Sequence, residues 1–387
     1  MVTAAEFDEL VSLLREFIRH EVMPAEVGID ESDEIPARLI AQAKEMGLYG
    51  YAIPAEYGGL GLSVEQQVRV AIELGYTSPA FRSLFGTNNG IAGQVLVSAG
   101  TDQQRKQWLP RLASGEVVAS FALTEPDAGS DPSRLVTTAQ GDSDGWVIDG
   151  LKRYITNAPA ADVFMVFART DPDAPPGKGI GVFIVPARIP GVTVAPKDHK
   201  MGQAGAWTAD VAFNGVRVPA DALVGEAAQA GYATAMRSLA HGRLTIAGVC
   251  VGVSARLIDE SVTYAKERSQ GGHTIGEYQL VQAMLADSET EYLAARALVL
   301  DAAAQYDAGT DRRLGPSAAK YFASEAVGRI ADRAVQIHGG SGYIRGIAVE
   351  RLYRDVRLFR IYEGTSQIQQ VIIARQLLGK ATDARNG

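Results

Sequence analysis

A glutamate near the end of the chain has the surroundings expected of a general base. Glu363 lies in the segment Tyr-Glu-Gly-Thr, beside the apolar side chains of Ile361 and Tyr362. Apolar neighbours exclude water from a carboxylate and raise its pKa, as a base that works near neutrality requires. Gly364 allows a tight turn and a close approach of the backbone to a ligand. The alternative is a solvated glutamate that only stabilises a helix start through the helix dipole.

The elements that hold this glutamate can be read from the hydrophobic pattern. Ser366 and Gln369 have the spacing of a capping box, so a helix is predicted to begin directly after Glu363. The last part of the chain has long helical patterns, which predict helices over Tyr232–Arg268, Glu277–Asp307, Ser317–Gln336 and Ser366–Leu378. Four such helices are expected to build an up-and-down bundle.

Two further zones precede this bundle. Up to about residue 120 the pattern is helical, with Pro36 and Gly47 bounding one helix and others expected over about 63–75, 80–99 and 102–114. From about residue 121 to 228, short apolar runs alternate with turn residues. This pattern predicts strands over Trp146–Ile155, Asp162–Thr170, Gly179–Val185, Val192–Ala195 and Ala209–Val218.

The sequence therefore predicts an α+β multidomain fold. We expect an N-terminal α-helical domain over residues 1–120, a middle β domain over residues 121–228 and a C-terminal α-helical four-helix bundle over residues 229–387. The middle domain is expected to be an antiparallel β-sandwich or barrel, because no helices separate its strands as they would in a parallel sheet.

Composition excludes several classes of protein. Hydrophobic residues make up 47% of the 387 residues and charged residues 21%, which is typical of a soluble globular protein. A net charge of −8 without a dense basic run disfavours nucleic-acid binding. The apolar runs are too short for a membrane span. The first residues form an amphipathic helical pattern instead of a signal peptide, so we expect a cytoplasmic protein without membrane attachment.

Cysteine and histidine do not indicate a metal site. Cys250 is the single cysteine and is expected to be a buried small hydrophobic residue. The five histidines lack metal-ligand spacing, so no metal is expected. The Gly-Lys-Gly-Ile-Gly segment at 177–181 resembles a dinucleotide loop, but it opens a predicted strand and not a helix.

Four motifs occur in an order typical of one enzyme family. They are Phe121-Ala-Leu-Thr-Glu-Pro-Asp-Ala-Gly-Ser-Asp131, Lys152-Arg-Tyr-Ile-Thr-Asn157, Gln336-Ile-His-Gly-Gly-Ser-Gly342 and Arg354-Asp-Val-Arg-Leu-Phe-Arg-Ile-Tyr-Glu-Gly-Thr-Ser-Gln-Ile-Gln369. With the α–β–α zoning, the chain resembles the acyl-CoA dehydrogenase family over essentially its whole length. The resemblance implies FAD, a homotetramer, and α,β-dehydrogenation of an acyl-CoA thioester to a trans-2-enoyl-CoA. It also implies that Glu363 is the base and that an electron-transferring flavoprotein accepts the electrons.

The same resemblance implies which residues hold FAD. The segment starting at Phe121 matches the flavin clamp of the family, and Tyr154 replaces the tryptophan that the family usually has. Gln336 and the two glycines that follow it match a loop that a partner subunit contributes. The implied FAD-binding residues are Phe121, Leu123, Thr124, Ser130, Tyr154, Ile155, Thr156, Arg268, Gln279, Gln336, Gly339, Gly340, Thr365 and Gln367.

The segments Ala80-Phe-Arg-Ser83, Gly-Ser-Asp-Pro-Ser at 129–133 and Ile-Thr-Asn-Ala-Pro-Ala-Ala-Asp at 155–162 resemble the glutaryl-CoA dehydrogenase branch of the family more closely than other branches. This resemblance implies a short dicarboxylyl-CoA substrate. Arg82 and Ser83 match the pair that holds the distal carboxylate in that branch, and a guanidinium pairs bidentately with a carboxylate. The alternative is that Arg82 bridges to a neighbouring helix, and Gly75 replaces the glutamate that supports this arginine in the branch. The other residues implied to contact substrate are Ser130, Arg243 and Gly364.

Two other functions remain open at this point. One is a family member that eliminates a β-leaving group from an acyl-CoA without net oxidation, and the intact Glu363 argues against it. The other is a non-catalytic acyl-CoA-binding protein that has lost its flavin. The retained flavin-contact residues argue against that second function.

Overall fold

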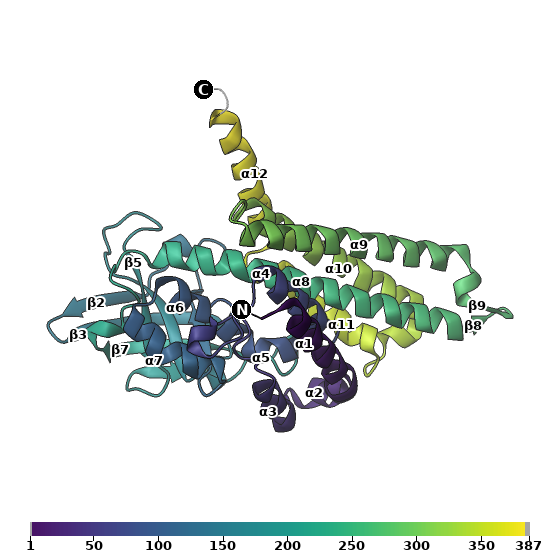
Figure 1. The fold of residues 1–387 in the computed structure, drawn as a ribbon, viewed down its shortest axis with the longest axis horizontal. Helices are drawn as coiled ribbons and strands as arrows, with labels where there is room; N and C mark the ends of the chain where they lie inside the picture. The colour runs from purple at the N-terminus through teal and green to yellow at the C-terminus, as the bar shows by residue number, and fades with distance from the viewer. Residues whose placement is uncertain (1, 384–387) are drawn as a thin grey trace.

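Seven α-helices make up the N-terminal zone of the computed structural model, which describes residues 2–383 (Figure 1). They are α1 (Ala4–Phe17), α2 (Glu26–Ser32), α3 (Ala37–Glu45), α4 (Val64–Gly75), α5 (Pro79–Asn89), α6 (Gly93–Ala99) and α7 (Asp102–Ala113). Capping boxes at Thr3, Ser63 and Thr101 begin α1, α4 and α7. The prediction of one helix over about 80–99 is wrong at its centre, because Gly90 leaves helical geometry (φ −97°, ψ −122°) and separates α5 from α6.

The middle zone folds into a seven-stranded sheet with mixed pairing. Its strands are β1 (Ala119–Ala122), β2 (Thr138–Asp142), β3 (Gly145–Thr156), β4 (Val163–Arg169), β5 (Ile180–Pro186), β6 (Val192–Val194) and β7 (Thr208–Val218). The strand order is β1-β4-β2-β3-β7-β6, and β5 pairs with β4. Most neighbours are antiparallel as predicted, but β1 and β2 each meet β4 in parallel. The segment with β2 and β3 lies between β1 and β4 in sequence, which leaves room for the crossover that a parallel pair needs.

Long helices make up the C-terminal zone, as the pattern predicts. They are α8 (Gly231–Glu267), α9 (Gln279–Asp307), α10 (Leu314–His338), α11 (Ala348–Val356) and α12 (Ser366–Asp383), with a short hairpin of β8 (Ser269–Gln270) and β9 (His273–Thr274). In the bundle α8, α9 and α10 lie side by side, and α4 packs against α8 and α9. The predicted fourth helix of the bundle, α12, contacts α10 but projects away from the other helices (Figure 1).

Glycines bring α4 and α8 into close contact. A Cβ added at Gly75 would lie 2.3 Å from the carbonyl oxygen of Val249, and one at Gly252 would lie 2.0 Å from that of Ile72. Any side chain at these two positions would push the helices apart. A glutamate at position 75 would therefore have no room in this packing.

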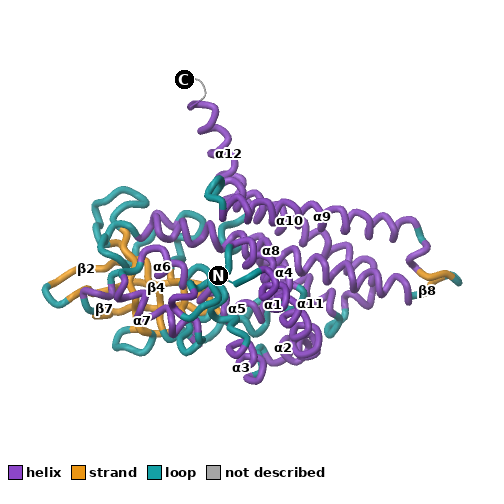
Figure 2. Tube along the Cα trace, viewed as in Figure 1, coloured by secondary structure: helices purple, strands orange, loops and turns teal. Residues whose placement is uncertain are grey.

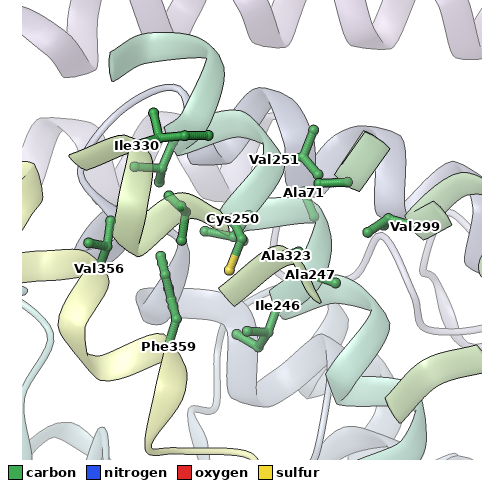
Figure 3. Packing of buried hydrophobic residues seen from close by; sticks show 14 of the residues in the cluster. Ala71, Ile246, Ala247, Cys250, Val251, Val299, Ala323, Ile330, Val356 and Phe359 are labelled. Carbon is green, nitrogen blue, oxygen red and sulfur yellow. The ribbon is translucent and has the colours of Figure 1, made fainter. Parts of the chain in front are cut away.

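The core of the bundle is formed by small and branched apolar side chains of α4, α8, α9 and α10, closed by Val356 and Phe359 (Figure 3). Cys250 is fully buried in this cluster, which confirms its predicted role as a small hydrophobic residue. The seven strands of the middle sheet gather at one end of the molecule, and the long helices extend to the other end, where the short β8–β9 hairpin lies (Figure 2). In the described residues 2–383, none of the helices is long and apolar enough to cross a membrane.

Candidate active site

A cavity of about 840 Å³ lies where the sheet, α5, α8 and the segment before α12 meet. It brings together side chains from widely separated parts of the chain. Most residues predicted to bind flavin or substrate line it: Arg82, Ser83, Phe121, Leu123, Thr124, Ser130, Tyr154, Ile155, Thr156, Arg243, Glu363 and Gly364. Gly177, from the segment that resembled a dinucleotide loop, also lines this cavity. That segment leads into strand β5 and not into a helix, as predicted.

Glu363 combines a left-handed main chain with a carboxyl oxygen that lacks a partner. Its φ is +56°, and its Oε2 atom is buried without a hydrogen bond to protein. Burial raises the pKa of Glu363, against a lowering effect from the charges of Arg82, Arg243 and Lys320. A buried carboxylate with a raised pKa is suited to accept a proton. The alternative of a fully solvated glutamate at a helix start is therefore wrong.

Donors from two helices hold the turn that contains Glu363. The Lys320 ammonium on α10 donates to the carbonyl oxygen of Gly364 at 2.7 Å. The Gln369 amide on α12 donates to the carbonyl oxygens of both Glu363 and Gly364, at 3.1 and 3.0 Å. These bonds satisfy main-chain carbonyls at a position where the backbone is not in a regular element. The turn is thus anchored from both sides.

The start of α12 is capped differently from the sequence prediction. The Thr365 hydroxyl accepts from the main-chain N–H of Ile368 at 3.2 Å, so Thr365 is the capping residue. Ser366 instead donates to the carboxylate of Glu325 on α10 at 2.6 Å. The predicted capping box of Ser366 and Gln369 is therefore wrong, because Gln369 bonds the carbonyls of the preceding turn.

Arg82 is a buried cation at the wall of the cavity. Its Nη2 donates to the Thr245 hydroxyl on α8 at 3.1 Å, and its Nε is buried without a partner. Its guanidinium lies against α5, where a Cβ added at Gly86 would lie 2.8 Å from Nη1. Among the ion pairs within 4.0 Å in the described residues, none includes Arg82. Arg82 therefore bridges to α8 through a hydrogen bond to the Thr245 hydroxyl. Within the described residues, no carboxylate lies within 4.0 Å of its guanidinium to neutralise the charge.

Arg243 lines the cavity and lies beside the base. It is buried on α8, and its Nε is 3.5 Å from the carbonyl oxygen of Glu363. Its Nη1 is 3.5 Å from the Ser317 hydroxyl on α10. Both contacts are long, so the guanidinium retains donor capacity toward a ligand.

A buried ion pair lies next to Leu123 of the cavity wall, and the sequence interpretation did not identify it. The Lys152 ammonium donates to the Glu125 carboxylate at 2.7 Å and to the carbonyl oxygen of Leu123 at 3.2 Å. Glu125 also accepts from the main-chain N–H groups of Val136 and Thr137, at 2.6 and 2.9 Å. Burial lowers the pKa of Lys152 to about 8, against the raising effect of Glu125. The pair positions Leu123, which lines the cavity.

Backbone strain is concentrated around the cavity. Within the described residues, non-glycine side chains with positive φ occur at five positions, and Tyr154 (+57°), Gln203 (+53°) and Glu363 (+56°) line the cavity. Asn157 (+62°) is next to it, and its side-chain amide donates to the Ser83 carbonyl oxygen at 2.8 Å. Strained residues persist where the surrounding structure holds them, and they cluster at functional sites. This clustering supports the cavity as the active site.

The remaining predicted FAD-binding residues lie outside the cavity. Arg268 follows α8 and Gln279 begins α9, and both are exposed beside the β8–β9 hairpin at the far end of the bundle (Figure 1). Gln336, Gly339 and Gly340 are exposed at the end of α10. Contact between Tyr264 and His338, with ring centroids 4.2 Å apart, holds the ends of α8 and α10 together. Thr365 and Gln367 begin α12 but do not line the cavity.

Models of one protein family match three successive parts of the chain. The N-terminal domain of acyl-CoA dehydrogenase matches residues 4–116, its middle domain residues 120–216 and its C-terminal domain residues 229–378. Among curated relatives, the 3-(aryl)acrylate reductase of Clostridium sporogenes is 38% identical over 374 residues, covering 96% of this chain and 99% of the relative. The caffeyl-CoA reductase-Etf complex subunit CarC of Acetobacterium woodii is 39% identical over 352 residues, covering 91% and 92%.

Solved structures show the same similarity in three dimensions. Butyryl-CoA dehydrogenase from Megasphaera elsdenii superimposes with a TM-score of 0.93 at 31% identity, covering 98% of this chain and 99% of that one. Glutaryl-CoA dehydrogenase from Mycobacterium smegmatis gives 0.90 at 32% identity, covering 98% and 96%. The two values are close, so the glutaryl-CoA dehydrogenase branch is one of several similar branches and is not singled out.

The residues of the cavity fit the flavin of FAD. The polar residues Thr124, Ser130 and Thr156 line it together with the apolar residues Phe121 and Ile155. A flat ring with polar edges suits such a wall of apolar surface and a few polar groups. At Gly129 an added Cβ would meet nothing within 4 Å, which leaves open space beside Ser130. Within residues 2–383, no three His, Cys, Asp or Glu side chains are grouped as metal ligands.

Proposed function

The chain belongs to the acyl-CoA dehydrogenase family, and we propose that it oxidises a short acyl-CoA thioester, with a polar or carboxylate distal end, to the trans-2-enoyl-CoA. The enzyme is an oxidoreductase, and the cofactor of its family is FAD. When bound, FAD supplies the acceptor for the hydride that leaves the β-carbon. The observation that carries the proposal is the buried, unpartnered Oε2 of Glu363 in a cavity lined by the residues that match the flavin site.

In this proposal Glu363 removes the α-proton of the thioester. Its buried carboxylate has a raised pKa and an oxygen without a partner, so it accepts a proton readily. The main-chain N–H of Glu363 polarises the thioester carbonyl as the negative charge develops there. The apolar side chains of Phe121 and Ile155 help to exclude water, which strengthens these electrostatic interactions.

The charges around Glu363 support a substrate with an acidic end. Three cations, Arg82, Arg243 and Lys320, act on the carboxylate of Glu363. A buried guanidinium is costly unless an anion pairs with it, and Arg82 has an unpartnered Nε at the cavity wall. The distal carboxylate of a dicarboxylyl-CoA would supply that anion, and Ser83 lies beside Arg82 to contribute a further polar contact.

A comparison of thioesters tests this part of the proposal. Glutaryl-CoA is compared with butyryl-CoA and hexanoyl-CoA in the wild type and in Arg82→Ala. If Arg82 contacts the carboxylate, the variant should lose about 1.5–3 kcal/mol of transition-state stabilisation for glutaryl-CoA, calculated from the ratio of kcat/KM values. The kcat/KM values for the neutral thioesters should change little. Equal use of all three thioesters, unaffected by the substitution, would identify an enzyme for plain short or medium acyl chains.

A second candidate is the same chemistry run as a reduction. Two relatives with 38% and 39% identity are named as reductases of an aryl acrylate and of caffeyl-CoA. In that direction Glu363 would donate the α-proton, and its raised pKa keeps a larger fraction of the carboxyl group protonated near neutrality. The test compares the rate at which the chemically reduced enzyme reduces cinnamoyl-CoA with the rate at which the oxidised enzyme oxidises saturated thioesters. A faster reduction would favour this candidate. The converse result favours the dehydrogenase.

Two partners complete the proposal. The caffeyl-CoA reductase relative is named as a subunit of a complex with Etf, which supports an electron-transferring flavoprotein as the electron acceptor. The exposed group of Arg268, Gln279 and Gln336 supports a homotetramer in which another subunit completes the FAD site. Light scattering of the purified protein would detect the tetramer, and reduction of added electron-transferring flavoprotein would detect the electron partner.

The two other functions lead to different results in the same assays. A protein that eliminates a β-leaving group would release that group from a β-substituted thioester without lasting flavin reduction. A non-catalytic acyl-CoA-binding protein would purify without FAD and fail to take up added FAD. A yellow protein whose flavin is bleached by a saturated thioester excludes both.

A further inference from the structure

We propose that Lys320 is a positioning residue for the base: its buried ammonium holds the Gly364 carbonyl and so fixes the turn that directs the Glu363 carboxylate into the cavity. This inference rests on the proposed function, because it assigns a role to Lys320 in proton removal by Glu363. None of the motifs in the sequence interpretation includes this lysine, which lies in the second turn of α10, far from Glu363 in sequence.

The first observation is the burial of a charge without a matching carboxylate. Lys320 is 0% exposed, and its Nζ donates to the Gly364 carbonyl oxygen at 2.7 Å. None of the ion pairs within 4.0 Å in residues 2–383 includes it. Burying an ammonium is costly, and here burial lowers the pKa of Lys320 to about 8. A purely structural position would be filled at lower cost by an apolar side chain.

The second observation is the strain in the turn that Lys320 holds. Glu363 has φ +56° and Gly364 has φ +88°. A left-handed conformation at a non-glycine residue is unfavourable and persists only when surrounding contacts enforce it. The contacts here are the bond from Lys320 on α10, the two bonds from Gln369 on α12 and the longer contact of 3.5 Å from Arg243 on α8. Removing the α10 anchor leaves the Gly364 carbonyl oxygen with the bond from Gln369.

The third observation is electrostatic. The groups that act on Glu363 are Arg82 from α5, Arg243 from α8 and Lys320 from α10. The groups that act on Lys320 are Cys250, Glu363, Arg243 and Glu325. The positive charge of Lys320 therefore favours the ionised form of Glu363, which is the form that accepts a proton. Loss of this charge raises the pKa of Glu363 further and shifts the working range of the enzyme to higher pH.

The test uses the FAD-loaded enzyme in three forms: wild type, Lys320→Met and Lys320→Gln. Methionine fills the space without a donor or a charge, and glutamine keeps an N–H donor without the charge. In Lys320→Met we expect the rate of flavin reduction by thioester to fall about 10- to 100-fold, and the acid limb of the kcat/KM profile to move to higher pH. In Lys320→Gln we expect a smaller loss of rate with the same direction of pH shift.

A second readout does not depend on activity. Infrared difference spectroscopy follows the carboxyl C=O band of Glu363, identified by its absence in Glu363→Gln, across a pH titration. The proposal expects this band to persist to higher pH in both Lys320 variants than in the wild type. A purely structural role would change thermal stability without moving the band.

A matched control separates the proposal from general damage to α10. Ser324 is buried on the same helix, and its hydroxyl donates to the Tyr321 carbonyl oxygen of its own helix, so Ser324→Ala should leave the rate and the pH profile unchanged. If Lys320→Met does not fold, Lys320→Gln alone decides. Lys320 variants that keep the wild-type rate and the wild-type acid limb would overturn the inference. A wild type that no thioester reduces would overturn the proposed function instead.

Discussion

Gly242 on α8 lies directly against the carboxylate of Glu363. A Cβ added at Gly242 would lie 2.8 Å from Oε2 and 3.2 Å from the carboxyl carbon of Glu363, and 3.1 Å from the side chain of Ile91. An added Cβ that lies less than 3.0 Å from another atom forces one of the two to shift. Here the carboxylate end of the Glu363 side chain is the part that can move. Gly242 thus provides the space in which the carboxylate of the base is held.

Gly242→Ala should displace this carboxylate without unfolding the protein. The new methyl group pushes Oε2 away, and a misplacement of about 1 Å can reduce the rate by about 100-fold. We expect a loss of about 10- to 100-fold in the rate of flavin reduction at unchanged FAD content. Gly28→Ala is the matched control, because Gly28 lies in α2 with nothing within 4 Å of an added Cβ. A variant with wild-type rate would show that the carboxylate occupies another position during the reaction.

The pH dependence of the rate should report the raised pKa of Glu363. Burial raises this pKa, so Glu363 takes up a proton at a higher pH than an exposed glutamate does as the solution is acidified. Because only the ionised form accepts a proton, kcat/KM for a saturated thioester should fall with decreasing pH, beginning above the usual range of a glutamate. A pH–rate profile that stays flat down to about pH 4.5 would contradict the burial of the base.

The ion pair of Glu125 and Lys152 should be important for stability. Both side chains are buried, with Nζ and Oε1 2.7 Å apart. Glu125→Gln leaves the Lys152 ammonium buried without its carboxylate, and we expect a loss of about 3–5 kcal/mol in the free energy of unfolding, measured with urea. The double variant Glu125→Gln with Lys152→Met should recover part of this loss. A loss below about 1 kcal/mol in the single variant would show that water reaches the pair.

Asp355 gives the free energy of unfolding a predictable pH dependence. It is buried, and burial raises its pKa to about 6, although the main-chain N–H of Gln203 donates to it. Between about pH 4 and 6 the folded state keeps a proton that the unfolded state has lost, so stability falls as pH rises through this range. The total fall is about 3 kcal/mol. Asp355→Asn should remove this slope in unfolding experiments, and an unchanged slope would assign it to other groups.

The sequence predicts the part of the site that lies in continuous motifs. Glu363 and Gly364 line the cavity, and so do Phe121, Leu123, Thr124, Gly129 and Ser130 of the first motif, because each motif includes a turn next to a regular element. Arg82 is also found there, since its helix was predicted. The comparisons do not single out the glutaryl-CoA dehydrogenase branch, because its structural match is close to that of another branch.

Two buried lysines, one in a helix and one in a strand, were missed for a physical reason. Lys320 occurs in an amphipathic pattern, where a lysine normally faces solvent, and its burial depends on the long-range packing of α8, α10 and the Glu363 turn. Lys152 is similarly hidden in a strand and is revealed only by its partner Glu125. The parallel pairing of β1 with β4 also depends on contacts between distant segments, which hydrophobic periodicity does not report.

The most direct test of the central claim measures flavin reduction in the wild type and in Glu363→Gln. Both purified proteins are loaded with FAD and mixed without oxygen with saturated acyl-CoA thioesters, while the flavin absorbance is followed. Glutamine keeps the shape of the side chain but cannot accept the α-proton, so we expect rapid bleaching in the wild type and a rate lower by several orders of magnitude in the variant, at equal FAD content. Bleaching of Glu363→Gln at the wild-type rate would contradict the assignment of Glu363 as the base.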